Sequence, residues 1–164
     1  MLDREANQMT RLKEVLDQVE DRYDYCFIDC PPGVGINVLN VLAAANDVII
    51  PIKADKNALD GMEELTEVIE EVRPYNLGLS LVKCLVTMFT NDIEVVKGEE
   101  ALQKSTYSTF YTHIRHSKKV NAWTFEKGKS LVEVTPRSAA TRDYKNLALE
   151  YMELTKEVKR NGNE

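Results

Sequence analysis

The chain has 164 residues, of which 43% are apolar, and a formal net charge of −6. This length and apolar content are sufficient for one hydrophobic core and predict a single domain over residues 1–164. The longest apolar run, around residues 38–45, is too short to cross a bilayer, and the first residues, MLDREANQ, lack the pattern of a signal peptide. We therefore expect a cytoplasmic protein that has no membrane partner.

The negative net charge conceals an uneven distribution of charge along the chain. Residues 1–96 carry a net charge of −10, whereas residues 97–164 carry +4. Residues 104–129 include six basic side chains and one acidic side chain, Glu126. This window is a candidate surface for a polyanion, although a basic run on a solvated surface with no partner is about as common.

Apolar periodicity predicts helices that alternate with short strands. A first helix is expected over residues 4–20, followed by an apolar strand over residues 25–29. Further helices are expected over residues 37–45, 58–72, 93–104, 118–126 and 138–159, and further strands over residues 48–52, 79–89 and 108–114. Short, nearly all-apolar strands separated by amphipathic helices indicate the α/β class, with a mostly parallel sheet flanked by helices in three layers.

The cysteines and histidines have spacings that favour packing roles over chemistry. Cys26, Cys30 and Cys84 lack the paired short spacings of a zinc site or a disulfide framework. Because Cys26 and Cys30 are four residues apart in the predicted strand, we expect both to be buried on one face of it. His113 and His116 have no third ligand in view, which favours a surface or strand-packing role.

An Asp-Cys-Pro-Pro elbow follows the first predicted strand. Chemistry in parallel sheets gathers at the carboxyl ends of the strands, and Asp29 is expected to lie at such an end. A carboxylate there can hold a magnesium ion through a water molecule, while Pro31 and Pro32 stiffen the loop that leads to Gly33. The same aspartate can instead serve only to orient a turn.

The stretch YDYCFIDCPPGVGINVLNVLAAANDVIIPIKADKNALDGMEEL closely resembles the switch elbow of ParA-type partition ATPases, to which the Soj and MinD proteins are related. The segments LVTMF, GKSLVEVTP and RSAATRDYKNLALEYM resemble later parts of that family, so the resemblance covers residues 23–152 in order. It implies a P-loop NTPase-like fold. It also implies a switch that dimerises with ATP and magnesium, binds DNA non-specifically and acts in plasmid or chromosome partitioning.

The resemblance also implies roles for individual residues. Asp29 corresponds to the magnesium-linked acid, which is the catalytic and metal-holding position of the family. The positions implied to border the nucleotide are Asp29, Pro31, Gly33, Thr87, Met88 and Arg115. Those implied to contact DNA are Arg115, Lys118, Lys119, Lys127 and Lys129. The implied partners are DNA, a second copy of the chain and a ParB-like protein, and the implied location is the bacterial nucleoid.

The family's phosphate-binding loop has no counterpart in the sequence. That loop is glycine-rich, carries two lysines and precedes the segments quoted above, and nothing in residues 1–22 resembles it. Gly128-Lys129-Ser130 is not such a loop, because Trp123 occupies the position at which the motif requires glycine. We therefore expect the carboxyl-terminal portion of a ParA-like ATPase domain, a fold incomplete at its amino-terminal side, and no appreciable ATP hydrolysis or nucleotide binding by this chain alone.

Alternatives to the partition switch stay open at this point. The family's Ile-Pro-Arg segment, whose proline borders adenine, reads Ile114-Arg115-His116 here. The chain can therefore be a nucleotide-independent DNA-binding or protein-interaction module derived from the same fold, or a folded remnant without activity. A missing central strand would leave apolar sheet edges, so we expect self-association or a rearranged sheet in which residues 48–52 move over.

Overall fold

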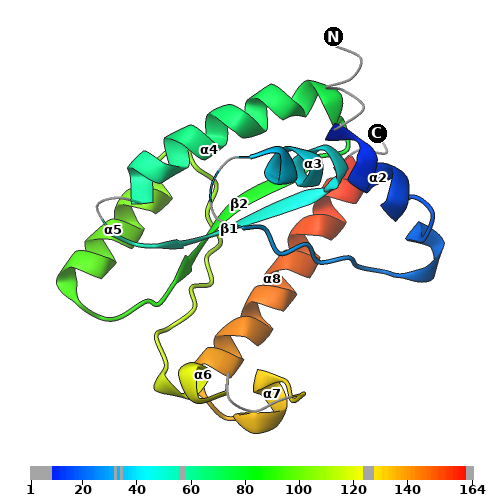
Figure 1. The fold of residues 1–164 in the computed structure, drawn as a ribbon. Coiled ribbons are helices and arrows are strands. Elements are labelled where there is room, and N and C mark those ends of the chain that lie inside the picture. Colours follow the sequence, from blue (N-terminus) through cyan, green and yellow to red (C-terminus); the bar gives the residue numbers. More distant parts are fainter. Residues whose placement is uncertain (1–8, 32, 34, 56–57, 124–127, 162–164) are drawn as a thin grey trace. The chain divides into compact units, whose positions relative to one another are not determined.

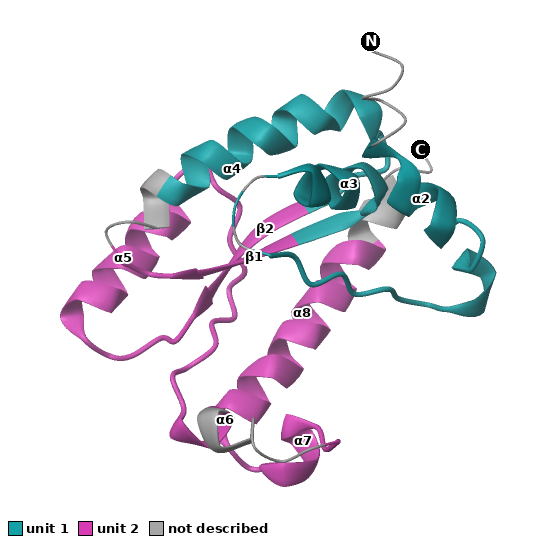
Figure 2. Cartoon of the chain, viewed as in Figure 1, with its two compact units in different colours: residues 1–48, 60–81 teal, residues 49–59, 82–164 magenta. Residues whose placement is uncertain are grey.

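A computed structural model of the chain describes residues 9–31, 33, 35–55, 58–123 and 128–161. The chain divides into two compact units, residues 1–48 with 60–81 and residues 49–59 with 82–164 (Figure 2). Figure 1 shows the helices and strands that make up these units. Over the residues described, no helix has the length and apolar character needed to cross a membrane.

The first unit is built from helices and helical turns. Its elements are α2 (Arg11–Leu16), the 3-10 turn η1 (Glu20–Arg22), α3 (Ile36–Ala44), most of α4 (Ala58–Val72) and the 3-10 turn η2 (Arg73–Tyr75). The buried side chains recur at helical spacing, as expected for amphipathic helices. They include Val38 and Leu42 of α3 and Met62, Ile69 and Val72 of α4.

Asn76 completes the carboxyl end of α3. The last carbonyl groups of a helix have no partner within the helix and must find one elsewhere. The side-chain amide of Asn76 donates to the carbonyl of Leu42 at 2.8 Å and to that of Ala45 at 2.7 Å. A residue that follows α4 and η2 in sequence thereby fixes the end of α3 within the same unit.

The second unit is built on a parallel sheet with helices beside it. Strand β1 (Asp47–Lys53) pairs with strand β2 (Leu81–Thr87). Isolated parallel bridges connect Cys84 with Thr109 and Phe89 with Arg115, so residues 108–116 run alongside β2. The helices are α5 (Ile93–Lys104), α6 (Lys118–Trp123), α7 (Leu131–Val134) and α8 (Ala139–Asn161). The α/β class predicted from the sequence is confirmed.

The bounds of several predicted elements agree closely with the structure. Helices α4 and α5 have the predicted bounds, and α3, α8 and β1 differ from theirs by at most two residues. The predicted strand over residues 79–89 is shorter, as β2, and residues 108–114 form single bridges rather than a regular strand. Of the first predicted helix the structure gives α2, and part of the predicted range lies outside the described residues, as residues 124–126 do for α6.

The predicted strand over residues 25–29 is wrong. These residues are extended but belong to no strand, and the Phe27 side chain is 89% exposed. Cys26 and Cys30 are exposed, so only Cys84 among the cysteines is buried as predicted. An apolar run forms a strand only when a neighbour takes its hydrogen bonds, and in the described part of the chain β1 pairs with β2 instead. Residues 48–52 lie in β1, whose partner is β2.

Gly98 allows α5 to lie very close to the residue that follows β1. A Cβ atom at position 98 would lie 2.4 Å from the carbonyl oxygen of Ala54, closer than real Cβ contacts come. Ala54 belongs to a buried cluster with Val86, Phe89 and Leu102. The absent side chain of Gly98 is thus what lets helix α5 close this cluster.

We predict that Gly98→Ala destabilises the fold by about 2 kcal/mol, because the added methyl group forces α5 away from Ala54. Urea unfolding followed by circular dichroism measures the change. The matched control is Gly61→Ala in α4, where a Cβ atom meets no heavy atom within 4 Å. This control is expected to gain up to about 1 kcal/mol from the better helix propensity of alanine. Equal stability of the two variants would contradict the close approach.

Candidate functional site

The elbow around Asp29 is an exposed, extended segment of the first unit. Asp29, Pro31 and Gly33 are all exposed, and Gly33 has a φ of +95°, a conformation that favours glycine. Helix α3 begins directly after Gly35. Partial desolvation of the thiol and, secondarily, the negative charge of Asp29 raise the pKa of Cys30. The elbow therefore presents its carboxylate to solvent from a loop that turns into a helix.

Asp29 offers a magnesium ion only one carboxylate. Within the described ranges, no group of three His, Cys, Asp or Glu side chains is placed to hold a metal. Magnesium prefers about six oxygen ligands and keeps several of its waters, so a single carboxylate can contribute to a site that phosphate oxygens and water complete. The residues present are compatible with a water-mediated role for Asp29 but do not form a metal site by themselves.

Thr87 and Met88 lie at the carboxyl end of β2 in the second unit. The Thr87 hydroxyl donates to the carbonyl of Ile52 at 3.1 Å and so joins the ends of β2 and β1. Met88 is the non-glycine residue found with a positive φ, +53°, and its side chain is exposed. A methionine in this left-handed conformation is strained, and such strain gathers at functional loops. Met88 is thus the side chain that this end of the sheet presents outward.

The residues next to Met88 anchor its loop to the segment 108–116. Phe89 is buried and stacks on His113, with ring centroids 3.8 Å apart and an angle of 13° between the planes. The Phe89 N–H donates to the carbonyl of Ile114, and the His116 N–H donates to the carbonyl of Phe89. His113 Nδ1 lies 2.7 Å from Glu99 Oε1 on α5. The packing role predicted for His113 is confirmed.

Two carboxylates of α8 hold the same segment from the other side. Glu150 accepts the backbone N–H groups of Tyr111 at 2.7 Å and Thr112 at 2.9 Å. Asp143 accepts the backbone N–H of Arg115 at 3.0 Å. The two acidic residues are seven positions apart, or about 10.5 Å along a helix, close to the length of three extended residues. Residues 111–115 therefore lie along α8 in a matching register.

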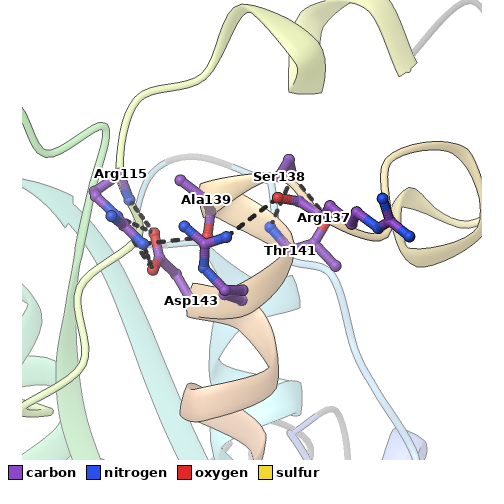
Figure 3. Close-up of polar contacts among 7 residues, drawn as sticks. Arg115, Arg137, Ser138, Ala139, Thr141 and Asp143 are labelled. Carbon is purple, nitrogen blue, oxygen red and sulfur yellow. Dashed lines mark hydrogen bonds and ion pairs between the residues drawn. The ribbon is translucent and has the colours of Figure 1, made fainter.

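The Arg115 side chain forms a forked ion pair with Asp143 (Figure 3). Its Nη2 donates to Asp143 Oδ1 at 2.6 Å and its Nε to Oδ2 at 2.9 Å, while Nη2 also approaches the carbonyl of Ala139 at 3.5 Å. The Asp143 side chain is 8% exposed and that of Arg115 is 42% exposed. Burial acts to raise the pKa of Asp143, but the hydrogen bonds and charge of Arg115 outweigh it and lower that pKa.

Buried hydroxyl groups cap the first turn of α8 beside this pair (Figure 3). The Ser138 Oγ accepts the backbone N–H of Thr141 at 3.1 Å, as an N-cap residue does. The Thr141 hydroxyl donates to the carbonyl of Thr135 at 2.6 Å. Ser138 and Thr141 are both buried, and their mutual bonds leave the amino end of α8 firmly placed.

Of the lysines predicted to contact DNA, Lys118 and Lys119 lie in α6 and Lys129 lies just before α7. Figure 1 shows both short helices near the amino end of α8. Lys118, Lys119 and Lys129 are exposed, and Lys127 lies outside the described residues. Sequence reasoning missed three further exposed basic residues, because its charge window ended at residue 129. We define the basic segment as the exposed basic residues Lys118, Lys119, Lys129, Arg137, Arg142 and Lys145.

Both acidic residues that the structure describes between residues 118 and 145 accept hydrogen bonds. Asp143 binds Arg115, and Glu133 accepts the backbone N–H of Ser130 at 2.7 Å and its hydroxyl at 2.6 Å. Those bonds from Ser130 lower the pKa of Glu133. Ser130 and Glu133 form a capping box that starts α7, a helix that apolar periodicity did not predict. The Ser-x-x-Glu pattern was the available signal for it.

Among the sequence-predicted residues, the structure brings Met88 and Arg115 to adjacent places. Phe89, which follows Met88, is bridged to Arg115 across the parallel pair. Thr87 belongs to the same unit, but its hydroxyl is bonded to β1. Asp29, Pro31 and Gly33 belong to the first unit, where they form the elbow described above.

Comparison with known proteins shows that the chain is similar to partition ATPases. The family model described as an AAA domain matches residues 1–81. The chromosome-partitioning ATPase Soj of Treponema pallidum is 33% identical over 150 residues, which are 89% of this chain and 58% of the relative. The sporulation initiation inhibitor protein Soj of Bacillus subtilis is 32% identical over 157 residues, 93% of this chain and 58% of the relative. The chain thus spans 58% of the length of each of these relatives.

Solved structures with the same fold include a plasmid partition protein and a synthase. A plasmid partition protein from Borrelia burgdorferi has a TM-score of 0.63 at 19% identity, covering 90% of this chain and 53% of that one. Cobyrinic acid a,c-diamide synthase from Mycobacterium smegmatis, solved with ADP and magnesium, has a TM-score of 0.60 at 22% identity, covering 74% of this chain and 55% of that one. At these identities the matches establish the fold.

We predict that Arg115→Ala destabilises the protein by about 2–3 kcal/mol, because it leaves the buried Asp143 carboxylate without its counter-ion. The cost lies below that of a fully buried pair, since the Arg115 side chain is 42% exposed. The control is Lys104→Ala, which removes an exposed pair with Glu100 and is expected to cost less than about 0.5 kcal/mol. Chemical unfolding of both variants gives the comparison, and equal costs would show that the Arg115 pair has no special weight.

Proposed function

This chain belongs to the ParA/Soj-type family of partition ATPases, and we propose that it acts in the segregation of plasmid or chromosomal DNA by binding DNA non-specifically through its basic segment. The observation that supports this most directly is the charge of that segment. It carries six exposed basic residues, and the two acidic residues described within it are engaged by Arg115 and Ser130. A surface of this kind binds the phosphate backbone without reading sequence.

The position of the basic residues on α8 strengthens the proposal. A helix amino end carries partial positive charge, so acidic residues are favoured there and basic residues oppose the dipole. The first turn of α8 has no acidic residue, while Arg137 lies just before the helix and Arg142 is its fourth residue. This arrangement costs local stability, and a polyanion that binds the exposed side chains would offset that cost.

The nucleotide-dependent part of the proposed function is assigned to other residues. We propose that, in a protein that also contains the phosphate-binding loop, Asp29, Pro31 and Gly33 serve as the switch elbow, with magnesium linked to Asp29 through water, and Thr87, Met88 and Arg115 border the nucleotide. Dimerisation with a second copy, stimulation by a ParB-like partner and association with the nucleoid belong to the same proposal. The 164 residues lack the family's glycine-rich loop with its lysines, so we propose that they do not hydrolyse ATP on their own.

We predict that the chain binds random-sequence duplex DNA with an affinity that falls with salt. About four phosphate contacts would give a slope of log affinity against log salt near −3.6. The variant Lys118→Gln with Lys119→Gln is expected to reduce the steepness by about 1.8, because each lysine releases roughly one counter-ion. Fluorescence anisotropy over a series of salt concentrations measures this slope.

The matched control for DNA binding is Lys97→Gln with Lys156→Gln, two exposed lysines outside the basic segment. It removes the same total charge and is expected to leave the slope unchanged. If this control flattens the slope as much as the Lys118 and Lys119 variant does, binding depends on net charge alone and the assignment to the basic segment fails.

We predict that isothermal calorimetry of the chain with magnesium and ATP shows no binding, and that no phosphate is released. The triphosphate needs backbone amides and lysines to neutralise it, and the sequence does not supply them in a glycine-rich loop. DNA affinity is then expected to be the same with and without ATP, the behaviour of a nucleotide-independent module. Phosphate release that Asp29→Ala abolishes would contradict this and show that a phosphate site forms without that loop.

A further inference from the structure

Arg115 precedes the basic segment by three residues, yet it differs from the lysines that follow. Lys118 and Lys119 are exposed side chains on a short helix. Arg115 instead uses Nε and Nη2 on the two oxygens of Asp143 and its backbone N–H on the same carboxylate. Its charge is therefore opposed by a fixed anion within the same unit, whereas no such contact is found for the two lysines among the described residues.

Asp143 occupies the side-on pair of N–H donors that Arg115 would offer to a phosphate. The guanidinium recognises carboxylates and phosphates in the same way, through a parallel pair of N–H groups. In Arg115 that pair consists of Nε–H and Nη2–H, and both point at Asp143 (Figure 3). A DNA phosphate could take this pair only by displacing the carboxylate, and the remaining Nη1 donors belong to a guanidinium whose charge Asp143 already balances.

That displacement is unfavourable. The Asp143 side chain is 8% exposed, so removal of Arg115 would leave a charged carboxylate in a largely dry environment. An exposed lysine loses no such partner when it turns to a phosphate. DNA contact at this end of the unit therefore falls to the lysines rather than to Arg115.

We propose that Asp143 acts as a built-in substitute for phosphate at Arg115, which makes Arg115 a positioning residue for residues 111–116 and removes it from the DNA-contacting set. This inference rests on the proposed DNA binding and changes the set of residues that the sequence suggests for it. Asp143 is thereby a residue that limits how many phosphates the surface can neutralise.

The test is the salt dependence of DNA binding in two variants, Asp143→Asn and the double variant Arg115→Gln with Asp143→Asn. Asparagine keeps an oxygen for the Arg115 N–H but frees the guanidinium, so Asp143→Asn is expected to bind DNA more tightly with a slope steeper by about 0.9. The double variant removes both charges and is expected to keep the wild-type slope. Thermal unfolding of both variants confirms that each is folded.

Two results would overturn the inference. If the double variant has a slope shallower than wild type by about 0.9, Arg115 contacts a phosphate in the native protein. If Asp143→Asn, folded, has the wild-type slope, the freed arginine does not reach DNA and Asp143 limits nothing.

Lys119→Gln in the same series separates this inference from the proposed function. A slope reduced by Lys119→Gln together with either result above overturns the role of Asp143 alone. Binding that is independent of salt in every variant overturns the proposed DNA binding and the inference with it.

Discussion

The second unit depends on the hydrogen bonds by which two carboxylates of α8 hold residues 111–115. A regular strand would pass its backbone N–H groups to neighbouring strands, yet residues 108–116 meet β2 only at isolated bridges. The N–H groups of Phe110, Ile114 and His116 go to carbonyls of β2 and of Phe89. Those of Tyr111, Thr112 and Arg115 go to the carboxylates of Glu150 and Asp143. Helix α8 therefore supplies acceptors that a second strand would otherwise provide, and it sets the position of Met88 through Phe89.

The fold could be predicted from the sequence wherever periodicity and boundary residues agreed. Helix α4 combines apolar residues at helical spacing with Pro74 just beyond its end, and its predicted bounds are confirmed. The strand predicted over residues 25–29 is not formed. An apolar run indicates a preference for burial, but it does not show which strand would pair with it. Helix α7 was not predicted, because its four residues are too few to show a helical periodicity. The capping box at its start was the available signal in the sequence.

The candidate site likewise has a part that the sequence predicts and a part that it does not. Exposure of Lys118, Lys119 and Lys129 follows from their charge, and charge is legible in a sequence. The ion pair of Arg115 cannot be predicted in this way. Its partner, Asp143, lies 28 residues away on a helix face whose residue types indicate exposure to solvent. Asp143 and Glu150 look like ordinary surface acids of an amphipathic helix until the extended segment is placed beside them. Long-range pairing of polar side chains with backbone is therefore the part of the site that only the structure supplies.

The role of Arg115 becomes clear from a comparison with proline. The family to which the chain is similar usually has proline there, and a proline has no N–H to donate. Arg115 gives Asp143 that backbone N–H together with two side-chain donors, so the segment is tied to α8 by bonds that a proline could not make. In the folded chain, an ion pair and a backbone hydrogen bond hold the position at which the resembled segment has a proline. In that ion pair the Asp143 side chain is buried and the Arg115 side chain is exposed in part. The pair therefore stiffens the backbone, and the charge of Arg115 stays balanced by Asp143.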